Sequence, residues 1–341
     1  TSGTAALLPH DPDFFSFVKV PYGFDPNAQC PTWLKFLEGA LPDGRVRDLL
    51  QEWLGGHLAQ RNFCRWVLLF GQGADGKTVV CIVLVEFLGP ANVSSVGLDQ
   101  FDPKRTFPLA ATIGKLANVV EELAPASKAA EGLLKLFVSC ANLTIEEKYK
   151  PAFNIRPTAK LTFATNELPK LTDRSDGVWR RLILFPFENQ ILDESKQDKR
   201  LVEPQFWRNS GELPGIFLWA LRGRKRLIER GHFVEPESCL RAKAGYRSDM
   251  NPAATFLSQS VRLKAGARIS SSELYFRYTA FTEGVGERPL TAAQFAHEVR
   301  RAFPGVRLSD NPVSFGKGRR TRAWLGLEFV PDSDTPGTAA L

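Results

Sequence analysis

The sequence is poor in the residues that build disulfide frameworks and structural metal sites. It has five cysteines and four histidines among 341 residues. The cysteines are odd in number and widely spaced, with no C-x-x-C pair, and the histidines never pair at ligand spacing. We therefore expect neither a disulfide-stabilised fold nor a structural zinc site.

Long apolar runs are also missing. The longest, around Val79 to Leu88, is interrupted by Glu86 and is too short to cross a bilayer. The first residues, TSGTAALLPH, lack the charged and apolar regions of a signal peptide. We expect an unprocessed cytoplasmic protein that makes no contact with a membrane.

The composition is that of a folded protein, with 43% hydrophobic and 24% charged residues, and it leaves room for two or three packed units. The formal net charge is +7. Twelve Lys and Arg against six Asp and Glu lie between Ala253 and Val330. This segment is therefore the first candidate for contact with nucleic acid. The Pro-, Gly- and Asp-containing tail, 331–341, is expected to be disordered.

Hydrophobic periodicity indicates an α/β core between helical segments. Residues 31–60 predict two amphipathic helices separated by Pro-Asp-Gly. Four short apolar runs predict buried strands between residues 61 and 187: RWVLLFG, KLANVV, AKLTFATN and RRLILFPF. The pattern is helical again over 190–246, and the break at Asn251-Pro252 opens a last unit.

The strongest motif lies directly after the first strand. GQGADGKT fits G-x-x-x-x-G-K-[ST] and precedes a helical run, as a phosphate-binding loop requires. Lys77 would bind the β- and γ-phosphates, and the Thr78 hydroxyl would hold Mg²⁺. The alternative is a glycine-rich turn with an incidental lysine. The predicted nucleotide-binding residues are Gly71, Gln72, Gly73, Ala74, Asp75, Gly76, Lys77 and Thr78.

Polar residues end the next two strands. KLANVVEEL places Glu121 and Glu122 where a carboxylate could hold the metal and activate the attacking water. We assign the metal to Glu121. AKLTFATN ends in Asn166, which could touch the γ-phosphate or orient the water. A solvated helix start and an ordinary turn residue are the respective alternatives.

Two basic groups have less specific positions. Arg180 and Arg181 precede the strand RRLILFPF and could reach a phosphate at the site of a neighbouring subunit. Lys148, Tyr149 and Lys150 would lie near the tip of a hairpin, where cations around an aromatic ring suit a nucleic-acid strand. The alternatives are a surface arginine pair and a solvated hairpin.

The basic C-terminal unit has the outline of a winged helix. Residues 271–281 and 290–303 predict helices, the second opened by a capping box between Thr291 and Gln294, and VSFGKGRRTRAWLGLEF predicts a hairpin with a basic tip. The alternative is a small packing domain with solvated arginines. The predicted DNA contacts of this unit are His297, Arg301, Lys317, Arg319, Arg320 and Arg322.

The order of these motifs resembles the superfamily 3 helicases, in particular the helicase part of phage and plasmid primases and of pox-virus-type primase-helicases. The resemblance extends from about Pro31 to Val330. It implies an α/β fold, with an AAA+ P-loop core, an N-terminal helical segment and a C-terminal winged-helix-like domain. The expected boundaries are 1–60 for the N-terminal segment, 61–190 for the core, 191–250 for a helical segment, 251–330 for the winged-helix-like domain and 331–341 for the tail.

The resemblance also implies roles for single residues. Glu121 and Glu122 would be the Walker B acids, and Asn166 would be sensor 1. Arg181 would be the arginine finger acting in trans, with Arg180 in reserve. Lys148 and Lys150 would belong to the hairpin that grips DNA in the channel of a hexameric ring.

Two features depart from the family. Asp75 stands where an asparagine is frequent, which places an extra carboxylate beside the phosphates. Only about thirty residues precede the helical pair, too few for the polymerising domain that primases of this type place upstream. We expect either a stand-alone helicase or a fragment of a longer primase-helicase.

The motifs and the resemblance together predict an ATP-dependent replicative DNA helicase of a virus, phage or plasmid-like mobile element. It would use ATP and Mg²⁺. The resemblance implies that it forms a homo-hexamer on single-stranded and forked DNA and works with a primase or polymerase in the host cytoplasm. One alternative is an initiator or origin-binding protein that uses ATP as a switch. A further alternative is a phosphate-loop ATPase with another substrate, such as a small-molecule kinase.

Overall fold

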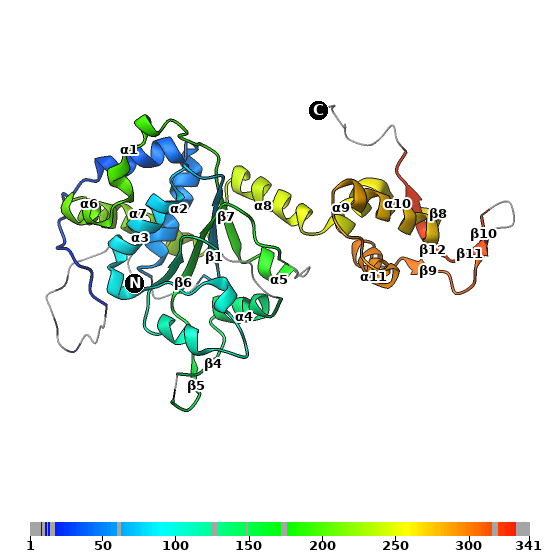
Figure 1. Cartoon of the computed structure of the whole chain (residues 1–341), viewed down its shortest axis with the longest axis horizontal. Helices are drawn as coiled ribbons and strands as arrows, with labels where there is room; N and C mark the ends of the chain where they lie inside the picture. Colours follow the sequence, from blue (N-terminus) through cyan, green and yellow to red (C-terminus); the bar gives the residue numbers. More distant parts are fainter. Residues whose placement is uncertain are drawn as a thin grey trace. The chain divides into compact units, whose positions relative to one another are not determined.

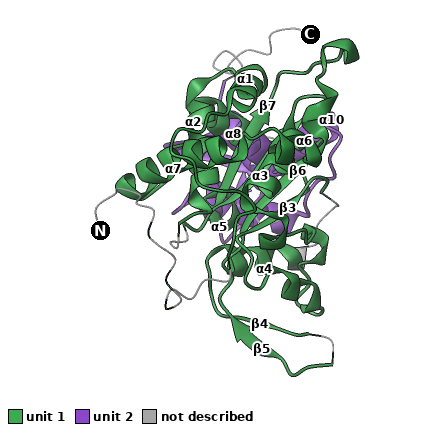
Figure 2. Ribbon diagram, turned by 90° about the vertical axis from the view of Figure 1, so that its left-hand side faces the viewer, with its two compact units in different colours: residues 1–244 green, residues 245–341 purple. Residues whose placement is uncertain are grey.

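The computed structural model describes residues 8, 11, 13, 18–59, 63–123, 128–147, 149–171, 176–315 and 320–331. The chain divides into two compact units, unit 1 with residues 1–244 and unit 2 with residues 245–341 (Figure 2). The second unit thus begins six residues before the predicted boundary at 251, inside a helix. All but the first residue of the predicted tail, 331–341, lies outside the described residues.

Unit 1 is an α/β unit built on a parallel sheet (Figure 1). Its helices are α1 (Pro31–Ala40), α2 (Gly44–Gly56), α3 (Lys77–Leu88), α4 (Lys128–Val138), α5 (Asp176–Trp179), α6 (Pro204–Asn209), α7 (Leu213–Arg230) and α8 (Glu237–Asp249), which continues into unit 2. Its strands are β1 (Trp66–Gly71), β2 (Val93–Ser94), β3 (Ala117–Val120), β4 (Leu143–Ile145), β5 (Phe153–Ile155), β6 (Lys160–Thr165) and β7 (Leu182–Phe187). Short 3₁₀ turns are η1 (Pro90–Asn92), η2 (Leu98–Gln100), η3 (Phe107–Thr112), η4 (Glu194–Lys196) and η5 (Lys199–Val202).

The central sheet has the strand order β2-β3-β6-β1-β7, with every pair parallel. The four predicted strands are confirmed as β1, β3, β6 and β7, and the two-residue strand β2 joins them at one edge. They read as continuous apolar runs because a parallel sheet is buried on both faces. Val67 and Leu69 of β1 share one hydrophobic core with the helices α1, α2, α3, α6 and α7.

This strand order determines where a site can form. The carboxyl ends of parallel strands meet at one edge of the sheet, and β1 lies between β6 and β7. After β1 the chain crosses to β2, at one edge of the sheet. After β6 it crosses to β7, on the opposite side of β1. Ligands of open α/β sheets bind at such a change of direction, outside the carboxyl ends of the strands.

The predicted helix pair is confirmed as α1 and α2, and it packs into the core of unit 1. Helices α2 and α7 approach so closely that a Cβ atom on Gly223 would lie 2.3 Å from the carbonyl oxygen of Gln51. The indole Nε1 of Trp53 donates a hydrogen bond of 2.9 Å to Thr162 Oγ1 on β6. The carboxylate of Glu212 accepts from the first backbone N–H groups of α1, at 3.1 Å each.

Two buried carboxylates of this unit are paired with arginines. Glu86, which interrupts the longest apolar run, is buried and accepts two hydrogen bonds of 2.6 and 2.7 Å from the guanidinium of Arg208. Glu52 of α2 is buried between Arg226 and Arg230 of α7. A buried carboxylate with its partner is tolerated where an unpaired one is not.

The hairpin between β4 and β5 extends away from the central sheet in both views (Figures 1 and 2). Its first strand is anchored, since Leu143 and Ile145 are buried and the backbone N–H of Glu146 donates to Thr106 Oγ1 at 3.1 Å. Its second strand is exposed over most of its length. The tip is thus held away from the body of unit 1.

The described part of unit 2 combines an antiparallel sheet with the end of α8 and three complete helices. The helices are α9 (Pro252–Ser260), α10 (Ser271–Gly284) and α11 (Ala292–Ala302). The strands are β8 (Val261–Ser270), β9 (Arg307–Leu308), β10 (Val313–Ser314), β11 (Arg320–Thr321) and β12 (Ala323–Phe329), in a sheet β8-β12-β9 and a separate pair β10-β11. The capping box of Thr291 and Gln294 is confirmed, and the ring of Phe295 stacks on Tyr278 at 4.1 Å in the core.

The helices of the described segments are all too short or too polar to span a lipid bilayer.

Candidate active site

The loop between β1 and α3 is curled by three residues with positive φ. Gly73 and Gly76 have φ of 97° and 96°, and Ala74 has φ of 53°. Such turns bring successive backbone N–H groups to one concave side, where an anion can bind. Gly71 is needed for a different reason, because a Cβ atom there would lie 2.5 Å from the carbonyl oxygen of Phe187 on β7.

Lys77 opens helix α3 and is buried inside the loop. Its ammonium donates to the carbonyl oxygen of Gly71 at 2.9 Å and to Asp75 Oδ2 at 2.5 Å. Asp75 is also buried, and it accepts from the backbone N–H groups of Gly73 and Lys77. The next side chain, Thr78, is exposed.

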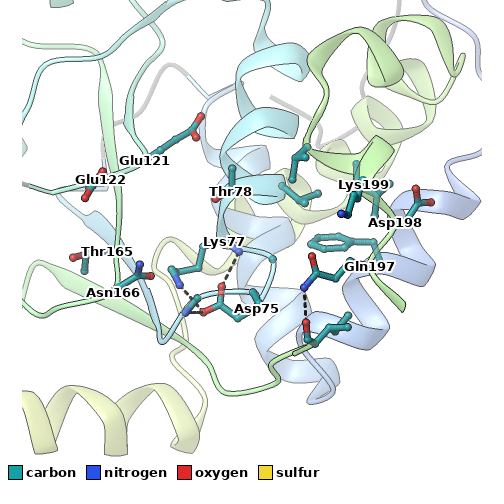
Figure 3. A pocket seen from close by; sticks show the side chains of 18 of the residues that line it. Asp75, Lys77, Thr78, Glu121, Glu122, Thr165, Asn166, Gln197, Asp198 and Lys199 are labelled. Carbon is teal, nitrogen blue, oxygen red and sulfur yellow. Dashed lines mark hydrogen bonds and ion pairs between the residues drawn. The ribbon is translucent and has the colours of Figure 1, made fainter. Parts of the chain in front are cut away.

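A cavity of about 760 Å³ lies beside this loop (Figure 3). Its walls come from the loop, from the carboxyl ends of β3 and β6, from α1 and from the segment that follows β7. The lining residues are Phe36, Gly73, Ala74, Asp75, Gly76, Lys77, Thr78, Val79, Glu121, Glu122, Leu123, Thr165, Asn166, Glu167, Ile191, Gln197, Asp198, Lys199, Leu201 and Val202.

The structure brings the predicted acids and the predicted amide to the same cavity. Glu121 and Glu122 follow β3 directly, and Asn166 follows β6. In Figure 3 the Asn166 amide points toward the side chain of Lys77. Protein atoms replace part of the water around Glu121, and this desolvation raises the pKa of its carboxyl. Cation, carboxylate and amide groups thus surround one space.

The far half of the cavity was not predicted, and it carries apolar side chains beside the polar Gln197, Asp198 and Lys199 (Figure 3). Phe36 of α1 lines it together with Ile191, Leu201 and Val202 from the segment after β7. Ile191 and Val202 are 44% and 48% exposed. The sequence signal for this half is a few aliphatic residues within the polar stretch QILDESKQDKRLV, which is too weak to mark a site.

Hydrogen bonds hold this segment against the loop. The backbone N–H of Ile191 donates to the carbonyl oxygen of Ala74 at 2.8 Å. The side-chain Nε2 of Gln190 donates to the carbonyl oxygen of Gly73 at 2.9 Å. Gln197 Nε2 donates to the Ile191 carbonyl oxygen at 2.6 Å. The apolar half is therefore attached to the loop that carries Lys77.

Arg180 and Arg181 lie away from the cavity of their own chain. The carbonyl oxygen of Arg181 accepts from the backbone N–H of Trp66, so Arg181 lies at the amino ends of β7 and β1. The loop that carries Lys77 follows the opposite, carboxyl end of β1. Six residues of β7, at about 3.3 Å each, separate the two edges by about 20 Å. The Arg181 guanidinium donates to the Gly177 carbonyl oxygen. Partial burial, together with the charges of Arg180 and Arg65, lowers its pKa.

The predicted hairpin residues are at the tip between β4 and β5. Tyr149 is fully exposed, with φ of 65°, and Lys150 pairs with Glu147. Lys148 lies outside the described residues. In unit 2, the side chains of His297 and Arg301 are exposed on α11, and those of Arg320 and Arg322 are exposed in and just after β11. The remaining wing residues, Lys317 and Arg319, lie outside the described residues.

A family model described as a family of unknown function (DUF5906) matches residues 69–181. This match begins in β1 and ends at Arg181, so it includes the loop, the acids after β3 and Asn166.

Three viral proteins have similar sequences. "Putative helicase L207/L206" of Acanthamoeba polyphaga mimivirus is 27% identical over 189 residues, which are 51% of this chain and 19% of that protein. "Putative helicase 184R" of Invertebrate iridescent virus 6 is 30% identical over 44% of this chain and 18% of its own length. "Putative helicase 022R" of Frog virus 3 is 23% identical over 73% of this chain and 27% of its own length. The chain thus spans only about a fifth to a quarter of these relatives.

Solved structures of the NrS-1 C terminal region share the fold. The A form apo structure superposes with a TM-score of 0.55 at 12% identity, over 89% of this chain and 79% of that one. A second, of residues 305–718, gives a TM-score of 0.52 at 11% identity, over 89% and 77% of the two chains. The chain is therefore similar in sequence to a part of viral proteins named as helicases, and in fold to the NrS-1 C terminal region.

Proposed function

We propose that this chain is the ATP-hydrolysing motor of a replicative DNA helicase of the superfamily 3 type, from a virus, phage or plasmid-like mobile element. The observation that carries the proposal is the meeting of Lys77, Thr78, Glu121, Glu122 and Asn166 in one cavity at the carboxyl edge of a parallel sheet. The viral relatives, which are named as helicases, support the helicase part of this proposal.

The cavity fits a nucleoside triphosphate with Mg²⁺. The curled loop and Lys77 provide donors for phosphates on one side, and Phe36, Leu201 and Val202 provide apolar surface for a base on the other. The described residues include no cluster of three or more His, Cys, Asp or Glu that could hold a metal by itself. Mg²⁺ commonly uses one or two protein ligands together with substrate phosphates, so Thr78 and Glu121 would hold it. Its charge would offset the negative charge that develops on the phosphates.

The remaining polar groups of the cavity have separate tasks in this proposal. Glu122 accepts a proton from the attacking water or orients it. Asn166 donates to the terminal phosphate, in keeping with its orientation toward Lys77 in Figure 3. Lys77 holds the phosphates through charge-assisted hydrogen bonds, which are about twice as strong as neutral ones.

Arg181 is proposed as a finger that acts on a neighbouring subunit, with Arg180 in reserve. The length of β7 separates Arg181 from the loop of its own chain, which supports a role at a site on another copy. A head-to-tail contact of this kind builds a ring when its rotation closes, and each subunit then completes the next. We propose a homo-hexamer of AAA+ type.

DNA contact is proposed at two places. The exposed hairpin tip, with Tyr149 and Lys150 and the neighbouring Lys148, would grip a single strand by stacking and by charge. Unit 2 would act as a winged-helix-like domain that binds phosphates. Its contacts would be His297, Arg301, Lys317, Arg319, Arg320 and Arg322. A primase or polymerase would act beside this motor on single-stranded and forked DNA, in the host cytoplasm.

The test is ATP-dependent unwinding of a labelled forked DNA, alongside ATPase assays with and without single-stranded DNA. Lys77→Ala should abolish both activities, because the charge that holds the β- and γ-phosphates is lost. ATP turnover that ignores DNA would refute the helicase and favour another phosphate-loop ATPase. Normal turnover in the Lys77→Ala variant would refute the site itself.

An ATP-switched initiator or origin-binding protein is the second candidate, favoured by the exposed basic residues of unit 2. Glu122→Gln separates the two functions, since it should trap bound ATP. A switch would still load DNA and support initiation in this state, whereas a motor would stop.

A further inference from the structure

Asp75 occupies an unusual place for an acidic residue, inside a loop that is proposed to bind phosphate. Its side chain is 3% exposed. One carboxylate oxygen accepts from the Lys77 ammonium at 2.5 Å and from the Gly73 N–H at 3.1 Å, and the other accepts from the Lys77 N–H at 3.3 Å. The carboxylate thus takes three donors of the loop at once.

These donors include the main cation of the site. An ammonium group has three protons, and two of those on Lys77 are already directed to Asp75 and to the Gly71 carbonyl oxygen. A phosphate approaching Lys77 would meet an ion pair that is already formed, with a negative charge beside it. Like charges in a poorly solvated site repel strongly.

We propose that Asp75 is an internal competitor of the phosphates of the nucleotide. In the ligand-free protein its carboxylate satisfies the loop donors, and this contact must be broken or displaced before a diphosphate can bind to Lys77. The inference rests on the proposed nucleotide site and adds a control of its affinity. The competitor is part of the loop, so its effective concentration is high and does not vary.

The charge, rather than the shape, of Asp75 carries this effect. Asp75→Asn keeps the size of the side chain and one acceptor oxygen but removes the negative charge. Hydrogen bonds to charged groups are stronger than neutral ones, so the neutral amide should yield the donors more readily. We expect ADP to bind about tenfold more tightly to this variant.

The experiment is isothermal titration of the wild type and of Asp75→Asn with ADP and with AMP. AMP is the internal comparison, because it lacks the β-phosphate that Lys77 would bind, and its affinity should change less than about twofold. Asp193→Asn is the matched control, since Asp193 carries the same charge outside the cavity lining. Asp75→Ala also removes the charge and replaces the amide variant if that variant fails to fold.

Each outcome is decisive. A gain for ADP that is confined to the Asp75 variants supports the proposal. Unchanged or weaker ADP binding would overturn it and make Asp75 an organiser of the loop, and an equal gain in Asp193→Asn would overturn it in favour of a general charge effect. If the wild type binds ADP and Lys77→Ala does not, the nucleotide site stands whatever Asp75 does. If no variant binds ADP, both proposals fail.

Discussion

The contact between α2 and α7 provides a sharp test of how unit 1 is packed. A Cβ atom on Gly223 would lie 2.3 Å from the Gln51 carbonyl oxygen and 2.8 Å from the Glu52 backbone nitrogen. Both neighbours are backbone atoms, so no side-chain rotation can make room, and the helices would have to separate by about 1 Å. Overpacking of this kind costs about 1–3 kcal/mol. We expect Gly223→Ala to lower the free energy of unfolding by about 2 kcal/mol.

Gly132 offers the matched control within the same unit. It lies inside α4, is exposed, and has no atom within 4 Å of the position of an added Cβ. Gly132→Ala should therefore raise the free energy of unfolding by about 0.5–1 kcal/mol, because alanine favours the helix. Urea unfolding of both variants and the wild type, followed by far-UV circular dichroism, measures the difference. If Gly223→Ala proved as stable as Gly132→Ala, the close approach of the two helices would be refuted.

Three further predictions concern charge. Arg181→Ala should leave ATP binding nearly intact and lower hydrolysis by about 10³-fold or more, with activity partly restored in rings mixed with Lys77→Ala subunits; if only Arg180→Ala behaves in this way, the finger has been assigned to the wrong residue. Replacing Arg320 and Arg322 together by alanine should reduce the salt dependence of DNA binding by about two phosphate contacts, and an unchanged slope would indicate that these arginines are only solvated. Burial lowers the pKa of His57 to about 3 in the folded protein, below its value near 6.5 in the unfolded chain. The free energy of unfolding should therefore fall as the pH drops below 6.5, by up to about 1.4 kcal/mol per pH unit. The same decline in a His57→Gln variant would refute this origin.

The parts of the structure that could be predicted from the sequence are those with local causes. Buried parallel strands produce apolar runs, amphipathic helices produce a period of 3.6 residues, and the capping box of Thr291 and Gln294 uses residues three positions apart. The meeting of the two acids and Asn166 at one cavity could also be predicted, because parallel strands bring residues that follow them to one edge. Glu121 and Asn166 are 45 positions apart, yet each could be located because it directly follows a strand with an apolar pattern.

The unpredicted parts depend on contacts between distant segments. The cap of α1 is Glu212, almost 180 positions away, and no pattern near Pro31 indicates it. In the sequence Glu86 only interrupts an apolar run, and its partner Arg208 is visible only in the structure. The strand order belongs to the same class, since hydrophobic periodicity does not specify which strands are neighbours.

Helix α1 contacts the loop that carries Lys77 and also lines the cavity. The ring of Phe36 lies so close to Gly76 that a Cβ atom on that glycine would be 2.8 Å from it. Gly76 has positive φ and directly precedes Lys77, so the N-terminal helices restrict the loop at the residue before its cation. A rearrangement of α1 would therefore shift Phe36 in the cavity wall together with the loop at Gly76. Helix α1 is for this reason a part of the site, although the motifs of the sequence begin only at Gly71.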